Sequence, residues 1–181
     1  MTRVPQVIPD ELSPEQRKVH DLIVSTRESK IGGPFALWIR NANLAAAANQ
    51  MGNALRLEGK LDPRVFELVI LVIARQWSAQ YEWFVHANAA ARAGLDENVV
   101  EAIRTHRVPA FADPQQQLAY ELVRELLDTY SLSDATYARA LDIFGVDLVS
   151  EIVTVTGFYT LAAMMLKAFD APVPGGARPL D

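Results

Sequence analysis

The longest strongly apolar run in the chain extends from Leu68 to Ala74, and a second apolar stretch lies between Ile152 and Thr156. Both runs are rich in β-branched residues, so periodicity alone fits a strand as well as a helix. Each run nevertheless lies inside a proline-free segment longer than a typical strand, and no turn signal brackets it closely. We therefore predict helices over 63–76 and 147–169. Because these helices are apolar on nearly all sides, we expect them in the core or at a subunit interface.

Helix starts are marked by capping side chains followed by proline. Asp62-Pro63 and Asp113-Pro114 each place a carboxylate cap before a proline at the first helical position. Ser13-Pro14 does the same with a hydroxyl, and Gln16, three residues after the cap, completes a capping box. These signals predict helices that begin at residues 14, 63 and 114.

Glycines mark the expected helix ends. Gly59, Gly94 and Gly145 each follow a helix-compatible stretch, as is typical where the chain turns left-handed to leave a helix. The ten prolines cluster near the two ends and at four internal positions, which leaves long segments free for helices. The sequence thus predicts an all-α fold with helices near 14–28, 43–58, 63–76, 79–93, 96–105, 114–129, 133–144 and 147–169.

Length and composition indicate one globular domain of 181 residues, of which 50% are hydrophobic and 22% charged. We expect an N-terminal arm at 1–12, the helical domain at 13–170 and a flexible tail at 171–181. The formal charge of −5 provides no basic field for nucleic acid, and no apolar run approaches the roughly 20 residues that cross a bilayer. Prolines interrupt the N-terminus where a secretory signal would need a continuous apolar stretch. We therefore expect a soluble cytoplasmic protein without nucleic-acid or membrane partners.

The densest cluster of chemically capable side chains extends from Arg75 to His86. On a helix, Glu82 and His86 project from the same face, so the carboxylate can orient the imidazole for proton transfer near neutral pH. Tyr81 and Trp83 flank the glutamate, and aromatic walls that exclude water would raise its pKa. The alternative is an ordinary surface pair on a helix whose aromatic residues face the core.

Glu67 is a second candidate, because it is the only acidic residue within its apolar run. It precedes His86 by nineteen residues, about 28 Å along one straight helix, so the two can meet only if the chain reverses between them. A reversal near 77–80 would form an antiparallel hairpin and bring Glu67, Arg75 and His86 toward one cleft with Glu82. The alternative for Glu67 is a salt bridge to Arg64 or Arg75.

The run between Asp62 and Gly94 resembles the core motif of the carboxymuconolactone decarboxylase family, whose all-helical fold is shared with the alkyl hydroperoxidase D proteins. The resemblance rests on Glu67, on the triplet Tyr81-Glu82-Trp83, on His86 and on the small-residue helix that ends the run. Weaker similarity covers most of the remaining chain. It implies a helical bundle with a central antiparallel helix hairpin.

Peroxidase members of that family resemble this chain in an acidic residue at position 67 and a histidine at position 86, but have cysteines at positions 79 and 82. Here these positions hold Ala79 and Glu82, and the chain contains no cysteine. A thiol peroxidase needs one thiolate to attack and a second thiol to resolve the product. The sequence therefore excludes thiol peroxidase chemistry.

Decarboxylase members are similar in having a glutamate four residues before the motif histidine. The resemblance implies a cofactor-free lyase that removes carbon dioxide from a small carboxylated lactone or another intermediate of aromatic catabolism. His86 would supply a proton, Glu82 would set the charge of the imidazole, and Glu67 would act as a relay or second acid.

Other residues are expected to bind the substrate. Arg40 and Arg75 are candidates to bind a substrate carboxylate, and Tyr159 could donate its hydroxyl, beside Tyr81 and Trp83. The resemblance also implies a homo-oligomer, often a trimer or a hexamer. Two alternatives stay open. One is a metal-dependent member of the family whose ligands are Glu67, Glu82 and His86, and the other is a non-catalytic oligomeric scaffold.

Overall fold

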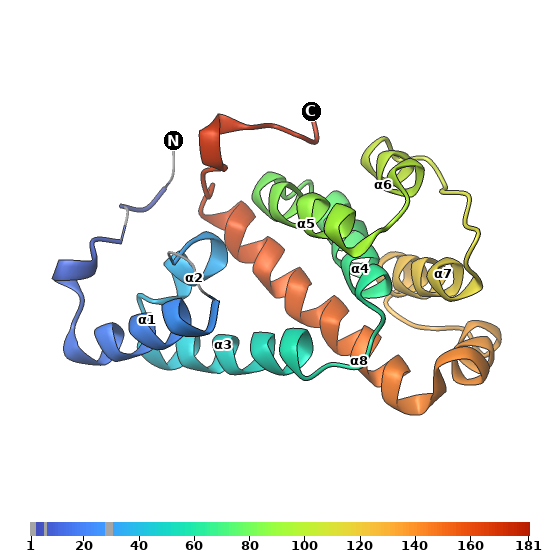
Figure 1. Ribbon diagram of the computed structural model, residues 1–181, viewed down its shortest axis with the longest axis horizontal. Coiled ribbons are helices and arrows are strands. Elements are labelled where there is room, and N and C mark those ends of the chain that lie inside the picture. The colour runs from blue at the N-terminus through green and yellow to red at the C-terminus, as the bar shows by residue number, and fades with distance from the viewer. Residues whose placement is uncertain (1–2, 6, 28–30) are drawn as a thin grey trace.

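The computed structural model describes residues 3–5, 7–27 and 31–181. Its helices pack into one bundle, which confirms the predicted all-α class (Figure 1). Position 28, the predicted end of the first helix, and parts of the N-terminal arm lie outside the described residues. Single 3-10 turns lie at Pro9–Glu11 and Pro174–Gly176. The α-helices are α1 (Pro14–Arg27), α2 (Gly33–Trp38), α3 (Ala42–Leu57), α4 (Pro63–Gln76), α5 (Gln80–Ala93), α6 (Glu97–Arg104), α7 (Pro114–Thr129) and α8 (Asp134–Ala168).

Helix α4 forms the centre of the bundle. Every residue from Val65 to Ala74 is buried, and α4 packs against α5, α6, α7 and α8. Both β-branched runs are helical, so the prediction of helix over strand is confirmed. A smaller apolar cluster around Ile23, Trp38 and Ala162 joins α1, α2 and α3 to the C-terminal part of α8, on the left of Figure 1.

Side-chain caps are confirmed at all three predicted helix starts. Asp62 and Asp113 each accept a hydrogen bond from a first-turn backbone N–H, at 2.8 and 2.9 Å. Ser13 Oγ accepts the N–H of Gln16 at 3.2 Å, while Gln16 Oε1 accepts the N–H of Ser13 at 3.0 Å. These side chains satisfy donors that a helix start otherwise leaves without partners.

The predicted chain reversal between α4 and α5 is also confirmed. Ser78 takes a left-handed conformation with φ +47°, and the N–H of Ala79 donates to the carbonyl oxygen of Ala74 at 2.8 Å. Among the described helices, α4 and α5 share the most extensive contact. The resulting hairpin carries Glu67 on one arm and His86 on the other.

Two of the three predicted glycine turns are confirmed. Gly94, with φ +80°, ends α5, and Gly145, with φ +69°, divides α8 into the two helices that the sequence predicts. The prediction for Gly59 is wrong, because this residue lies outside the left-handed region. Gly59 is instead needed for a close approach, since a Cβ there would lie 2.4 Å from Glu151 Oε1. The Glu151 carboxylate accepts the backbone N–H of Lys60 at 3.0 Å.

Helix α2 is absent from the sequence prediction because six residues are too few for a periodic signal and Gly33-Pro34 resembles a turn. Gly33 has φ +53°, and a Cβ on it would lie only 2.5 Å from the ring of Tyr81. The helix buries Phe35 and Trp38. Its glycine start therefore lets α2 pack closely over the first turn of α5.

The C-terminal segment 171–181 returns to the bundle. Leu180 is buried in the main core, and its N–H donates to Gln80 Oε1 at 2.9 Å. The limits of arm, domain and tail stay predictions. Of the described helices, α8 alone is long and apolar enough to cross a membrane, and it packs against α4 and α7 as a core helix does. The absence of a membrane partner likewise stays a prediction.

Replacing Gly33 with alanine is expected to destabilise the domain. The new Cβ would overlap the Tyr81 ring and would force a non-glycine residue to φ +53°. We expect a loss of about 1–3 kcal/mol in the free energy of unfolding, measured by urea denaturation. Gly157→Ala is the control, because a Cβ there meets nothing within 4 Å. Equal losses in both variants would contradict the close approach of Gly33 and Tyr81.

Exposed apolar side chains on α3 provide a test of the predicted homo-oligomer. Leu44 is 58% and Met51 45% exposed, on a helix without any charged residue from Ala42 to Leu55. If a second copy covers this face, Met51→Glu will reduce the mass measured by light scattering to that of the 20.0 kDa chain. Val108→Glu, at an exposed loop position, should leave the mass unchanged. A monomeric unsubstituted protein would contradict the prediction.

Candidate active site

A buried carboxylate and imidazole connect the two arms of the α4–α5 hairpin. His86 Nδ1 lies 2.7 Å from Glu67 Oε2, and both side chains are more than nine-tenths buried. The hydrogen bond orients the imidazole ring, and it makes Nε2 the nitrogen that would exchange a proton with a ligand. The apolar run of α4 places Glu67 in the core, where a carboxylate without a partner would be costly.

The structure corrects the predicted pairing of Glu82 with His86. Nδ1 of His86 bonds Glu67 from the facing helix, whereas Glu82 lies one turn earlier on α5. Glu82 is 3% exposed, and its buried Oε2 has no hydrogen-bond partner among the residues that the structure describes. Burial raises the pKa of Glu82 well above its ordinary value, in the direction expected from the sequence. Its neutral, protonated form is therefore favoured.

Arg56 and Tyr159 bring two further helices to this site. Arg56 Nη2 donates to the Tyr159 hydroxyl at 2.7 Å, and Arg56 Nη1 lies 4.0 Å from Glu67 Oε1. The Tyr159 ring stands edge-on to the His86 ring, with centroids 5.2 Å apart. Burial raises the pKa of Tyr159 to about 12, so the hydroxyl keeps its proton. Burial lowers the pKa of Arg56. Its electrostatic interactions with Tyr159 and Glu67 have the opposite and larger effect, so the pKa of the guanidinium is raised.

These groups surround a cavity of about 210 Å³. Arg56, Glu82, His86 and Tyr159 line it, while Glu67 lies behind the imidazole. A cavity of this size suits a small ligand, and its apolar wall strengthens electrostatic contacts inside it. The apolar and aromatic wall comes mainly from α1, α2 and α8 and includes Ile23, Phe35, Trp38, Phe158 and Leu166.

The cavity includes only some of the substrate-binding residues predicted from the sequence. Tyr159 and Tyr81 line it. Trp83 does not, because it is 2% exposed and faces the main core. Arg40 follows α2 and donates to the carbonyl oxygen of Pro5 in the N-terminal arm.

Arg75 does not reach the cavity either, so the expectation that it joins Glu67 in one cleft is wrong. It lies about 12 Å further along α4, where its Nη1 donates to the carbonyl oxygen of Leu180. The alternative of a salt bridge between Glu67 and Arg64 or Arg75 is also wrong. Arg64 pairs instead with Asp62, at 3.0 Å.

Sequence reasoning missed Arg56. Near the end of α3, an arginine is readily explained as a favourable charge in the last turn, and its approach to α4 and α8 depends on tertiary packing. One feature of the sequence could have indicated a role for Arg56, because it is the first charged residue after the uncharged segment 41–55.

The metal alternative gains no support from the arrangement of side chains. In the part of the chain that the structure describes, no group of three or more His, Cys, Asp or Glu side chains could hold a metal ion. Glu67 and Glu82 approach His86 differently, since the first bonds Nδ1 and the second has an oxygen without a partner. The scaffold alternative is favoured by a cavity too small for any ligand or by a His86 packed away from solvent. His86 lines the cavity of about 210 Å³, although it is itself only 6% exposed.

Two solved structures resemble the whole bundle. An uncharacterized peroxidase-related protein from Silicibacter sp. TM1040 is 17% identical, with a TM-score of 0.75 over 94% of this chain and 90% of that one. Another peroxidase-related protein, from Ralstonia eutropha JMP134, is 14% identical, with a TM-score of 0.78 over 95% and 92% of the two chains. That structure is described as an alkylhydroperoxidase AhpD core, and this chain has the same fold. No curated protein matches the chain.

A segment of the sequence also matches a known family. Residues 42–125 match the model of the Carboxymuconolactone decarboxylase family. This segment contains Arg56, Glu67, Glu82 and His86. Over this segment the chain is similar to the carboxymuconolactone decarboxylase family, and the resemblance noted from the sequence is confirmed.

The pH dependence of stability tests the neutral state of Glu82. Its pKa is higher in the folded chain than the ordinary 4.5, so the folded state binds more protons above that pH. Stability therefore falls as pH rises from 4.5 through the folded pKa. Because Glu82→Gln removes this titration, its stability relative to the unsubstituted protein should be greater at about pH 8 than at about pH 5. Urea denaturation at both pH values measures the difference.

A matched variant controls for the loss of one acidic group. Glu58 is exposed and follows α3, so Glu58→Gln should show no such gain between the two pH values. Comparing each variant across pH also cancels any loss of packing that the substitution causes. If Glu82→Gln and the unsubstituted protein respond identically to pH, Glu82 is ionised in the folded chain.

Proposed function

We propose that the protein is a cofactor-free lyase that acts by acid–base chemistry on a small carboxylated lactone or a related intermediate of aromatic catabolism. The observation that carries this proposal is a small cavity lined by a buried Glu82, whose pKa burial raises, and by a His86 that is hydrogen-bonded to Glu67. The match of residues 42–125 to the carboxymuconolactone decarboxylase family supports the class of reaction. Thiol peroxidase chemistry is excluded, because the chain contains no cysteine.

Arg56 takes the substrate-binding role that sequence reasoning gave to Arg40 and Arg75. It is the cation in the described lining of the cavity, so it would bind the carboxylate of the substrate. The aromatic side chains of Phe35 and Trp38 would pack against the ring of the substrate.

The reaction breaks the bond between a ring carbon and the carboxylate carbon. Carbon dioxide leaves, and the electron pair stays on the ring carbon and delocalises toward the carbonyl oxygen. Tyr159 can donate its hydroxyl to that oxygen, since Arg56 donates to the phenol oxygen rather than accepting from it. A neutral Glu82 supplies a second donor, as carboxylic acids in apolar sites do for enolates.

A proton must then reach the ring carbon. His86 supplies it from Nε2, and the carboxylate of Glu67 stabilises the charged imidazole beforehand through Nδ1. Water then reprotonates the imidazole after product release. The residues therefore differ in what they do, since Arg56 binds the substrate, Tyr159 and Glu82 stabilise negative charge, and His86 donates the proton.

Substitution of the polar residues tests this assignment. His86→Gln and Glu82→Leu should each lower turnover by about 10²–10⁴-fold, because the first removes the proton donor and the second removes a hydrogen-bond donor to the enolate. Release of carbon dioxide from a panel of carboxylated lactones and aromatic acids provides the assay. His20→Gln, on α1 and outside the cavity, is the control. Unchanged turnover in His86→Gln would contradict the mechanism, and equal losses of melting temperature and turnover would indicate a structural pair.

A further inference from the structure

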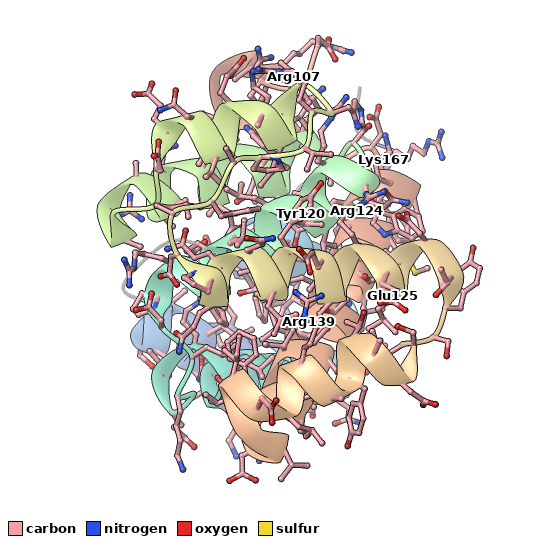
Figure 2. The ribbon with its side chains drawn as sticks, turned by 90° about the vertical axis from the view of Figure 1, so that its right-hand side faces the viewer. Arg107, Tyr120, Arg124, Glu125, Arg139 and Lys167 are labelled. Atoms are coloured by element: carbon pink, nitrogen blue, oxygen red, sulfur yellow. The ribbon has the colours of Figure 1, made fainter. Side chains whose placement is uncertain are left out.

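Arg75 lines a second cavity, of about 220 Å³, together with Arg107 and Arg124. Among the described residues, no acidic side chain lines this cavity. Figure 2 shows Tyr120 and Arg124 on the side of α7 that faces Arg107, while Arg139 lies on the other side of that helix. The rest of the lining consists of Val72, Ile103, His106, Val108 and Tyr120.

Two of these three arginines form no ion pair with a carboxylate among the described residues. Arg75 donates to a backbone carbonyl of the C-terminal segment at 3.4 Å, and its buried Nε has no hydrogen-bond partner in the described part of the chain. Arg107 Nε donates to the hydroxyl of Thr105 at 3.0 Å. Arg124 is compensated, because it donates twice to Asp128, at 2.8 and 2.9 Å. Glu101 interacts with the charge of Arg107 without forming a salt bridge to it. The cavity therefore gathers more positive charge than its directly paired carboxylates neutralise.

The pKa of Arg75 is consistent with an excess of positive charge in this cavity. Burial and the neighbouring Arg104 lower the pKa of Arg75, as expected for a guanidinium near another cation. Arg104 itself is paired with Glu101 at 2.7 Å, so it leaves no carboxylate for Arg75. This local accumulation occurs in a chain whose formal charge is −5. A bound anion would relieve the repulsion and accept a hydrogen bond from the unpartnered Nε.

We propose that this second cavity is an oxyanion-binding site for phosphate or a small phosphate monoester. Guanidinium groups present paired N–H donors that match the oxygens of such anions. Arg75 and Arg107 bind the oxyanion, while Arg124, which is paired with Asp128, completes this side of the cavity. Val72 and Tyr120 form a wall against which an organic group of the ester can pack. Arg75 is thus a ligand-binding residue of this site rather than of the catalytic cavity.

Calorimetric titration of the full chain with sodium phosphate and with phenyl phosphate, at constant ionic strength, tests the proposal. We expect saturable binding of at least one of them, which chloride does not reproduce. Tighter binding of phenyl phosphate would identify an ester as the ligand, and tighter binding of inorganic phosphate would identify the free anion. Arg107→Gln, at an exposed position, should raise the Kd about tenfold or more. Arg75→Gln should do the same where it folds.

Arg139→Gln is the matched control, because it removes the same charge from the other side of α7. Binding should be unchanged in this variant. Heats equal to those of chloride, an unchanged Kd in Arg107→Gln, or equal weakening in Arg139→Gln would overturn the proposal. Since the assay measures binding and needs no turnover, its result is independent of the proposed lyase activity.

Discussion

The hydrogen bond between Glu67 and His86 holds together the most apolar part of the bundle. Both side chains are polar and buried, and each would be costly in the core without the other. Their contact is possible only in one alignment of α4 against α5, so it specifies how the hairpin packs. Arg56 and Tyr159 then complete a network that spans four helices. The same pair thus contributes to the fold and provides the chemistry of the cavity.

Two glutamates near one histidine take different roles because their surroundings differ. Glu67 has the imidazole as a partner and a guanidinium at 4.0 Å. Glu82 has a buried oxygen without a hydrogen-bond partner among the described residues, and burial raises the pKa of its carboxyl group. One carboxyl group bonded to an imidazole and a second carboxyl group in an apolar environment form an arrangement typical of acid–base sites. The cysteine-free chain thus gains an acid at a position where its peroxidase relatives are expected to carry a thiol.

Much of the fold could be predicted from local signals. Caps at Ser13, Asp62 and Asp113 depend on neighbouring residues alone, and they define helix starts correctly. The meeting of Glu67 with His86 could also be anticipated, because an acidic residue in an apolar run needs a partner. Helix α2 could not be predicted in this way, because its six residues are too few for a periodic signal.

Contacts between helices that are distant in sequence explain why the sequence predicted the wrong partners for some residues. Helical spacing puts Glu82 and His86 on one face, but the ring nitrogen bonds across the hairpin instead. Arg56 reaches the cavity only because α3 packs beside α8, which no spacing in the sequence indicates. Arg75 is close to Glu67 along the chain, yet more than two helical turns separate their side chains.

The break at Gly145 divides α8 into two segments with different neighbours. Arg139 ties the first segment to Glu121 of α7, whereas the second segment carries Tyr159 to the site. Segments with separate contacts can open locally at different free energies. Fraying of the first segment would therefore leave Tyr159 and its partners in place. The break at Gly145 therefore separates local opening of the first segment from the residues that line the cavity.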